Sequence, residues 1–159
     1  MFSLKEKTAI ISGGSKGIGK SIAFKYAEAG ANVVICSRKK DNLDSAIEEA
    51  QTLGFNIIGI ECNTGEKESI NNVVDKTLEQ FKRVDILVNN AAANPYYGPI
   101  LNSEDSHWEK IWDINVKGYF NFIKACSKSM KDNKYGKIIN VASIAAKTPL
   151  DGLGVYNIS

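Results

Sequence analysis

The sequence has little cysteine and almost no histidine, with three of the former and one of the latter among 159 residues. Cys36, Cys62 and Cys126 form no CxxC pair, so the sequence predicts neither a disulfide framework nor a zinc site. No apolar run approaches the roughly 18 residues of a membrane span. The first residues, MFSLKEKTAII, carry charge where a secretory signal needs an apolar stretch. We therefore expect reduced cysteines in a cytoplasmic protein that no membrane anchors.

An excess of one charge sign is also missing. Twenty basic residues against eighteen acidic ones leave a net charge of +2, which gives no general attraction for nucleic acid or a membrane surface. The composition, 43% apolar and 24% charged, is that of an ordinary globular protein. Its length suits one compact domain, and we expect a single domain over residues 1–159.

Short apolar runs alternate with helical patterns along the whole chain. The runs predict strands, and the apolar residues at helical spacing predict helices between them. Such an alternation is typical of βαβ units, so the predicted fold is α/β, a doubly wound parallel sheet of the Rossmann type. Its ligand is expected at the carboxyl ends of the strands. The predicted strands are 8–12, 32–36, 55–60, 84–88 and 137–141, and the predicted helices are 17–29, 43–53, 70–81 and 106–130.

A glycine-rich loop follows the first predicted strand. Gly13, Gly17 and Gly19 have the spacing G-x-x-x-G-x-G, which lets a backbone turn tightly and present amide groups to a pyrophosphate. The same stretch also matches a P-loop, with Gly14, four intervening residues and then Gly19-Lys20-Ser21. The loop by itself is compatible with either a dinucleotide or a nucleoside triphosphate as its ligand.

The ends of the other strands favour the dinucleotide. A P-loop enzyme needs an aspartate at another strand end, whereas these strands end in Asn89-Asn90 and Ala142-Ser143. The second strand ends in Ser37-Arg38, where an acidic residue would bind the ribose of NAD and an arginine the 2′-phosphate of NADP. Lys16 of the glycine loop is expected to reach the same phosphate. The predicted cofactor is NADP(H).

Together these motifs resemble the short-chain dehydrogenase/reductase family, over the whole chain. Residues 12–19 are similar to its TGxxxGxG motif, and Asn89-Asn90-Ala91-Ala92 is similar to NNAG. Asn94-Pro95 resembles a carbonyl-reductase subset, and Asn63-Thr64 stands where the family has an aspartate and an apolar residue beside the adenine. With the loop analysis, the resemblance implies these cofactor-binding residues: Gly13, Ser15, Lys16, Gly17, Ile18, Gly19, Ser37, Arg38, Asn63, Thr64, Asn90 and Ala91.

The resemblance also implies a catalytic set. Tyr156 lies 13 residues after Ser143, the family's interval, and Asn115 matches its catalytic asparagine. In the family such a tyrosine is the acid and base, the serine binds the carbonyl oxygen, and the asparagine holds a water. The implied function is hydride transfer between NADP(H) and a small carbonyl or alcohol substrate, without a metal. The alternative is a non-catalytic NADP-binding module or redox sensor.

The family has a lysine four residues after its tyrosine, and this sequence reads Tyr156-Asn157-Ile158-Ser159. We therefore expect a longer natural chain, with lysine as its next residue and further strands. On that expectation the sheet is incomplete at its C-terminal end, the fifth strand is an exposed edge, and the 159-residue chain is inactive. A homo-oligomer is expected at full length. For His107, at the start of the long helix, we expect a surface or capping role.

Overall fold

A five-stranded parallel sheet organises the protein. The computed structural model describes residues 3–159. The strand order is β3-β2-β1-β4-β5, so the chain begins in the middle of the sheet, builds outward to β3 and returns to the other side of β1. This confirms the predicted doubly wound sheet. The strands are β1 (Thr8–Ser12), β2 (Asn32–Ser37), β3 (Ile57–Glu61), β4 (Ile86–Asn89) and β5 (Lys137–Asn140).

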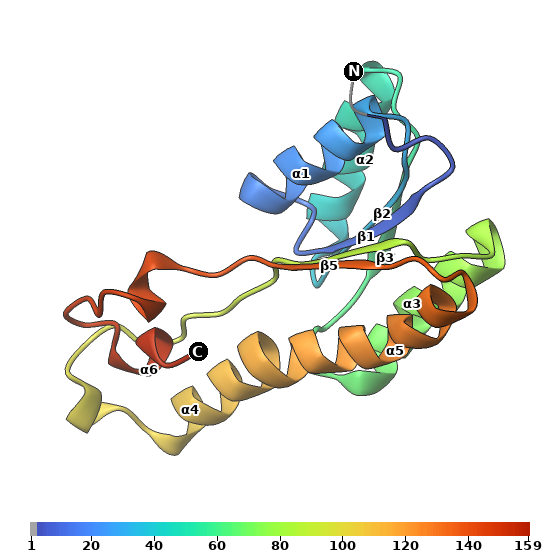
Figure 1. Ribbon diagram of the computed structural model, residues 1–159. Helices are drawn as coiled ribbons and strands as arrows, with labels where there is room; N and C mark the ends of the chain where they lie inside the picture. Colours follow the sequence, from blue (N-terminus) through green and yellow to red (C-terminus); the bar gives the residue numbers. More distant parts are fainter. Residues whose placement is uncertain (1–2) are drawn as a thin grey trace.

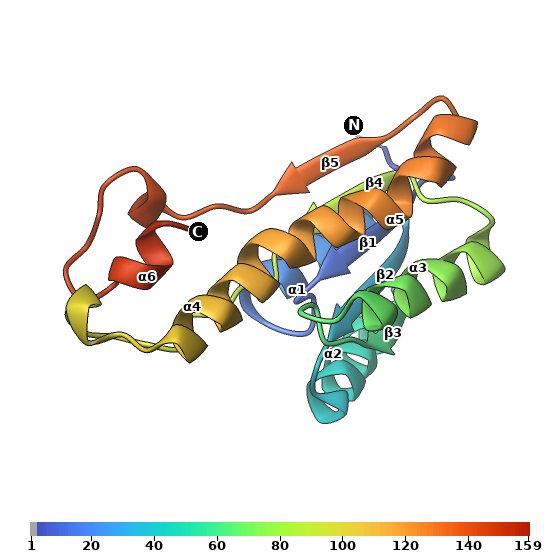
Figure 2. The same cartoon turned by 90° about the horizontal axis from the view of Figure 1, so that it is seen from below.

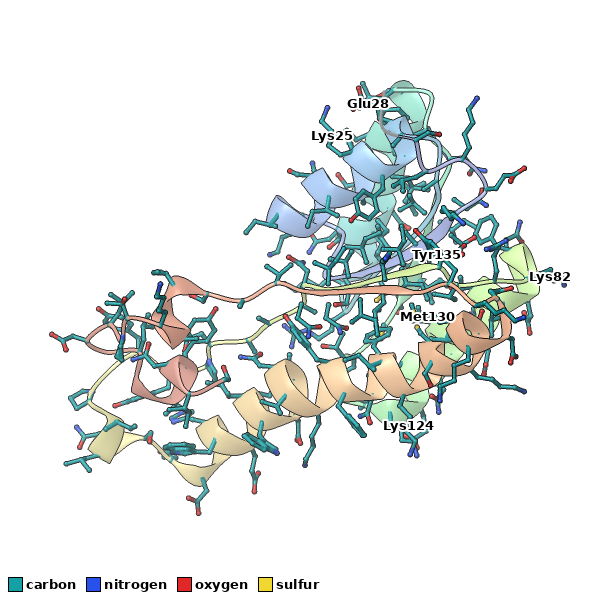
Figure 3. The ribbon with its side chains drawn as sticks, viewed as in Figure 1. Lys25, Glu28, Lys82, Lys124, Met130 and Tyr135 are labelled. Atoms are coloured by element: carbon teal, nitrogen blue, oxygen red, sulfur yellow. The ribbon has the colours of Figure 1, made fainter. Side chains whose placement is uncertain are left out.

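Helices cover both faces of this sheet (Figures 1 and 2). Helices α1 (Gly17–Glu28) and α2 (Lys40–Thr52) pack on one face, and α3 (Lys67–Phe81) and α5 (Gly118–Asp132) pack on the other. Each pair of helices encloses a hydrophobic core against the sheet. Met130 of α5 belongs to the core under α3 and α5 and points toward the sheet (Figure 3).

Strand β1 shows why the middle of each central strand is apolar at consecutive positions. All five of its residues are buried. Ala9 and Ile11 belong to the core under α1 and α2, whereas Ile10 belongs to the core under α3 and α5. Successive side chains point to opposite faces, so a sheet covered on both sides needs apolar residues without alternation.

The predicted long helix contains an irregular segment in its middle. Helix α4 (Asp105–Ile111) continues into a π-helical stretch, Trp112–Lys117, and then into α5. The continuous rod is visible in Figure 2. A Cβ on Gly118 would lie 2.5 Å from the Thr64 carbonyl oxygen, so glycine lets this rod approach the loop after β3. Short π-helical insertions occur frequently at functional sites.

A buried carboxylate fixes β4 beside β1 at the amino ends of the strands. Asp85, fully buried, accepts hydrogen bonds from the Thr8 backbone at 2.9 Å and from Arg83 Nε and Nη2 at 2.7 and 2.6 Å. These bonds compensate the cost of removing the charge from water. They set the register of β4 and therefore the position of the residues at its other end.

The segments after β4 and β5 lie together beyond the carboxyl edge of the sheet (Figure 1). The Gly98 backbone donates to the Gly152 carbonyl at 2.8 Å, which joins them. They contain two 3₁₀ turns, Ile100–Asn102 and Ile144–Ala146, and the short helix α6 (Gly154–Asn157). All four β5 residues are exposed. Within residues 3–159, no helix has both the length and the hydrophobicity needed to cross a bilayer.

Candidate active site and cofactor cavity

A cavity of about 460 Å³ opens at the carboxyl ends of the strands. It contains every predicted cofactor-binding residue except Gly19 and Asn63. A second cavity of about 580 Å³ runs along the outer edge of β3, between α2 and α3, and contains none of them. The site cavity is lined by Gly13, Ser15, Lys16, Gly17, Ile18, Ser37, Arg38, Lys39, Asn42, Cys62, Thr64, Asn90, Ala91, Ala92 and Ile114.

The glycine loop forms one wall of this cavity. Gly13 and Gly17 have φ angles of 65° and 57°, a left-handed conformation that favours glycine. Gly19 lies beneath the loop, where a Cβ would be 2.4 Å from the Gly13 carbonyl oxygen. Lys16 is the N-cap of α1 and its side chain makes no capping bond, so the first amides of this helix are available to an anion in the cavity.

Lys20, which a P-loop would direct at a phosphate, has another partner. Its Nζ lies 2.8 Å from Glu49 Oε2 and joins α1 to α2. It is absent from the residues that line the cavity. The loop geometry therefore does not support the triphosphate alternative.

Ser12 and Asn90 join the glycine loop to the end of β4. The Ser12 hydroxyl accepts from the backbone amides of Asn90 at 3.0 Å and Ala91 at 3.1 Å. In return, the Asn90 side chain donates to the carbonyl oxygens of Ser12 at 2.9 Å and Gly13 at 3.2 Å. The Asn90 side chain therefore holds the backbone of Ser12 and Gly13, which begins the glycine loop, against the end of β4.

Three cations line the cavity, and two of them, Arg38 and Lys39, directly follow β2. Lys16, Arg38 and Lys39 are exposed and line it, and Asn42 of α2 lies with them. No aspartate or glutamate is among the lining residues. This charge favours an anionic group such as a phosphate. Sequence reasoning missed Lys39 and Asn42, although Lys39 is adjacent to Arg38 and Asn42 lies in the first turn of α2.

Asn63 is bound within its own turn. Its Oδ1 accepts from the Gly65 amide at 3.2 Å, and its Nδ2 donates to Glu66 at 2.7 Å. It lies outside the cavity lining, whereas its neighbours Cys62 and Thr64 line it. The expected contact between the Asn63 side chain and adenine is therefore not prepared in this structure. A short polar side chain that binds nearby backbone is a common local alternative.

Two of the three predicted catalytic residues, Ser143 and Tyr156, belong to the segment after β5, and the third, Asn115, belongs to the rod that α4 and α5 form. Ser143 caps the 3₁₀ turn after β5, where its hydroxyl accepts from the Ala145 amide at 3.1 Å. Tyr156 is half-buried in α6. Asn115 lies in the π-helical stretch and is 8% exposed. The structure brings these elements to one side of the sheet, the side where the cavity opens.

Asn115 connects the loop after β4 to α6. Its Oδ1 accepts from the Ala93 amide at 2.8 Å, and its Nδ2 donates to the Ala93 carbonyl at 3.1 Å. The same Nδ2 donates to Ser159 Oγ at 2.9 Å, and Ser159 Oγ donates to the Tyr156 carbonyl at 3.0 Å. This chain of bonds fixes the backbone of Tyr156 relative to the cavity loop.

A second tyrosine, which sequence reasoning missed, supports the strand that leads to Ser143. The Tyr119 hydroxyl donates to the Val141 carbonyl at 3.2 Å. Burial, with a smaller effect of nearby Tyr156, raises the pKa of Tyr119 to about 12. Tyr119 therefore stays protonated at neutral pH and keeps this hydrogen bond.

His107 caps α4, as expected. Its Nδ1 accepts from the Glu104 backbone amide at 3.1 Å, and its ring stacks on Tyr96 with 4.8 Å between centroids. Among residues 3–159, no group of three or more histidine, cysteine or acidic side chains is placed to hold a metal.

Comparison with known proteins identifies the family. The model of the short chain dehydrogenases matches residues 7–159. The chain belongs to this family. It is 41% identical over 156 residues to dehydrogenase/reductase SDR family member 4 of Oryctolagus cuniculus, covering 98% of this chain and 60% of that protein. It is also 40% identical to the mitochondrial dehydrogenase/reductase SDR family member 2 of Homo sapiens, covering 98% of this chain and 55% of that protein. The chain thus spans less than two thirds of these curated relatives.

Solved structures of other short-chain dehydrogenases share the fold. A metagenomic short-chain oxidoreductase in complex with NADP superposes with a TM-score of 0.92 at 29% identity, over 98% of this chain and 70% of that one. A 7α-hydroxysteroid dehydrogenase, complexed with NADH and 7-oxo glycochenodeoxycholic acid, has a TM-score of 0.93 at 29% identity, over 99% and 61%. Both nicotinamide cofactors therefore occur among these structural relatives, and the choice between them depends on the residues of each cavity.

Proposed function

We propose that the natural protein containing this sequence is an NADP(H)-dependent carbonyl reductase or alcohol dehydrogenase. The observation that supports this most is the cavity, in which a glycine loop and a free helix N-terminus meet Lys16, Arg38 and Lys39. The loop and amides suit a pyrophosphate, and the three cations suit an additional phosphate on the adenosine ribose. The absence of a carboxylate from this lining removes the usual acceptor for the ribose hydroxyl of NAD.

The residues beyond β4 and β5 would perform the proton chemistry. When bound, NADPH supplies the hydride for reduction of a carbonyl carbon. Tyr156 holds the proton at its phenol oxygen and donates it to the carbonyl oxygen as negative charge develops there. Ser143 donates a hydrogen bond to the same oxygen and orients the substrate. Asn115, bound to Ala93 and Ser159, holds the Tyr156 backbone in position.

Titration of the purified protein with NADPH and NADH, followed by nicotinamide fluorescence, tests the cofactor assignment. We expect NADPH to bind at least about tenfold more tightly, because one charge-assisted hydrogen bond contributes about 1.5–3 kcal/mol. Equal binding, or a preference for NADH, would contradict it. A panel of carbonyl compounds, with NADPH oxidation as the readout, then tests the reaction. Binding without turnover of any of them would favour the alternative of a non-catalytic NADP-binding module.

An aromatic stripe supports a proposal of self-association. Trp108, Trp112 and Phe120 on the α4–α5 rod are 38%, 51% and 61% exposed, and large exposed apolar patches often mark interfaces. We propose that the natural protein forms a homo-oligomer that covers this stripe. Sedimentation of a Trp112→Glu variant should show smaller species, and an unchanged sedimentation coefficient would contradict the proposal.

The three cysteines are free, which supports the further proposal of a cytoplasmic location, testable by cell fractionation.

A further inference from the structure

The Tyr119 hydroxyl takes the place of a backbone amide at the end of the sheet. In a parallel pair of strands, each bonded residue donates its amide to one residue of the facing strand and accepts from the amide two residues further along. The Val141 amide donates to the Asn89 carbonyl at 2.8 Å, so the next bond of this pattern would come from Ala91. The Ala91 amide donates instead to the Ser12 hydroxyl at 3.1 Å. The Val141 carbonyl accepts from Tyr119 at 3.2 Å in its place.

This exchange of partners occurs where β4 leaves the sheet to line the cofactor cavity. Ala91 is part of the cavity lining, and its bond to Ser12 holds it there. The Val141 carbonyl would lose its partner at this point without a donor from another element. Tyr119, from the second residue of α5, supplies that donor and keeps the end of β5 bound on both sides.

The position of Val141 is passed directly to Ser143. Only Ala142 separates the two residues, and within residues 3–159 Ala142 takes part in no hydrogen bond. Ser143 has extended backbone angles, with φ of −120° and ψ of 152°. The Tyr119 bond is therefore the last one that holds the chain before the turn that Ser143 caps. The Ser143 oxygen accepts from the Ala145 amide in that turn, which leaves its own hydrogen free to donate to a substrate.

Tyr119 acts from the same part of the α4–α5 rod as Asn115. Asn115 lies four residues earlier, which is about one helical turn. It binds Ala93 in the segment after β4 and, through Ser159, the carbonyl of Tyr156. Two neighbouring turns of the rod thus hold both segments that carry the proposed proton chemistry.

We propose that Tyr119 is a positioning residue for the reaction, whose bond to the Val141 carbonyl holds the Ser143 hydroxyl opposite Tyr156. The proposal rests on the function proposed above. Tyr119 is absent from the cavity lining and its hydroxyl is committed to a backbone carbonyl, so it acts through Ser143.

The test compares the natural protein with its Tyr119→Phe variant, which loses the hydroxyl and keeps the ring. A fluorescence titration with NADPH first gives the affinity and the number of sites. We expect both to be unchanged, because Ala91 keeps its bond to Ser12. With a carbonyl substrate of the natural protein, kcat should fall about tenfold at unchanged KM, since a misplaced group slows the chemical step.

A double-mutant cycle shows whether Tyr119 acts through Ser143. Single-turnover rates at high enzyme concentration are measured for Ser143→Ala with and without Tyr119→Phe. Once the Ser143 hydroxyl is gone, there is nothing left for Tyr119 to position, so the two rates should agree. A loss that comes only from a weaker fold would lower the rate by the same factor in both backgrounds.

Hydrogen exchange gives a readout that does not depend on turnover. The Ala145 amide is bonded to Ser143, so peptides containing Ala145 should exchange faster in Tyr119→Phe, while those of β1 should not change. Tyr135→Phe is the matched control. Tyr135 lies two residues before β5, at the end of the strand away from the cavity (Figure 3), and its variant should match the wild type in kinetics and exchange.

Three outcomes would overturn the inference. They are a wild-type kcat in Tyr119→Phe, unchanged exchange at Ala145, and an equal loss of rate in both Ser143 backgrounds. If the wild-type protein does not reduce carbonyl compounds with NADPH, the proposed function fails instead. The exchange at Ala145 then still decides whether Tyr119 holds the Ser143 turn.

Discussion

Ser12 and Asn90 form two reciprocal hydrogen bonds at the carboxyl ends of the paired strands β1 and β4. The Asn90 amide donates to the Ser12 hydroxyl at 3.0 Å, and the Asn90 side chain donates to the Ser12 carbonyl at 2.9 Å. A ligand-binding edge of this kind lies where the strand order reverses, and here the reversal is at β1 and β4. The pair holds the two sides of the cavity together at this point.

Ser12→Ala should weaken both the fold and cofactor binding. It leaves the amides of Asn90 and Ala91 without their acceptor, at a cost of about 1–3 kcal/mol for each amide that water does not reach. Denaturant unfolding and an NADPH titration measure the two effects. Ser12→Thr, which keeps the hydroxyl, should restore most of both. An alanine variant with the wild-type unfolding free energy and affinity would show that this hydroxyl is dispensable.

Arg38→Asp should change the cofactor preference. The substitution removes a cation from the phosphate end of the cavity and adds an acceptor for a ribose hydroxyl, so NADPH binding should weaken by about 10- to 100-fold while NADH binding improves. Affinities for both cofactors, measured side by side, give the ratio. Lys124→Asp is the control, since Lys124 is exposed on α5 and lies away from the cavity (Figure 3). A ratio that moves equally in both variants would contradict a specific role of Arg38.

Asp85→Asn should destabilise the protein strongly. The change leaves the Arg83 guanidinium without its carboxylate and weakens the link between Thr8 and β4. Breaking a buried ion pair by removal of one partner typically costs about 3–5 kcal/mol. Because Arg83 is half-buried, we expect a value at the lower end, measured by urea unfolding. Asp75→Asn, at an exposed position of α3, should change the unfolding free energy by less than about 0.5 kcal/mol. Similar stability of both variants would refute this role of Asp85.

Features that depend on local backbone chemistry were predictable from the sequence. The positive φ angles of Gly13 and Gly17 and the buried β1 follow from glycine spacing and from a continuous apolar run. Of the predicted cofactor residues, only Gly19 and Asn63 lie outside the cavity lining. The turn that binds Asn63 is also local and was open to prediction, because asparagine commonly binds an amide two residues later.

Features that depend on tertiary contacts were not predictable in this way. The helical periodicity through residues 106–130 gave no sign of the π-helical stretch at Trp112–Lys117, because its apolar residues continue at nearly helical spacing. The contact between Tyr119 and Val141 joins elements that no pattern links. Cys62 was expected only to be a reduced cysteine, and the packing of β2 and β3 places this residue in the lining of the cavity. The catalytic roles of Asn115, Ser143 and Tyr156 remain predictions.

Replacement of Tyr156 by phenylalanine tests the central claim most directly. The measurement is the rate of NADPH oxidation with a carbonyl substrate of the natural protein, together with NADPH affinity. Tyr26→Phe, in α1 and outside the cavity, is the matched control and should keep the wild-type rate. We predict that Tyr156→Phe reduces the rate by at least about 100-fold, as loss of a general acid does, with NADPH affinity unchanged. A Tyr156→Phe variant that reduces the substrate at the wild-type rate would contradict the proposed enzymatic function.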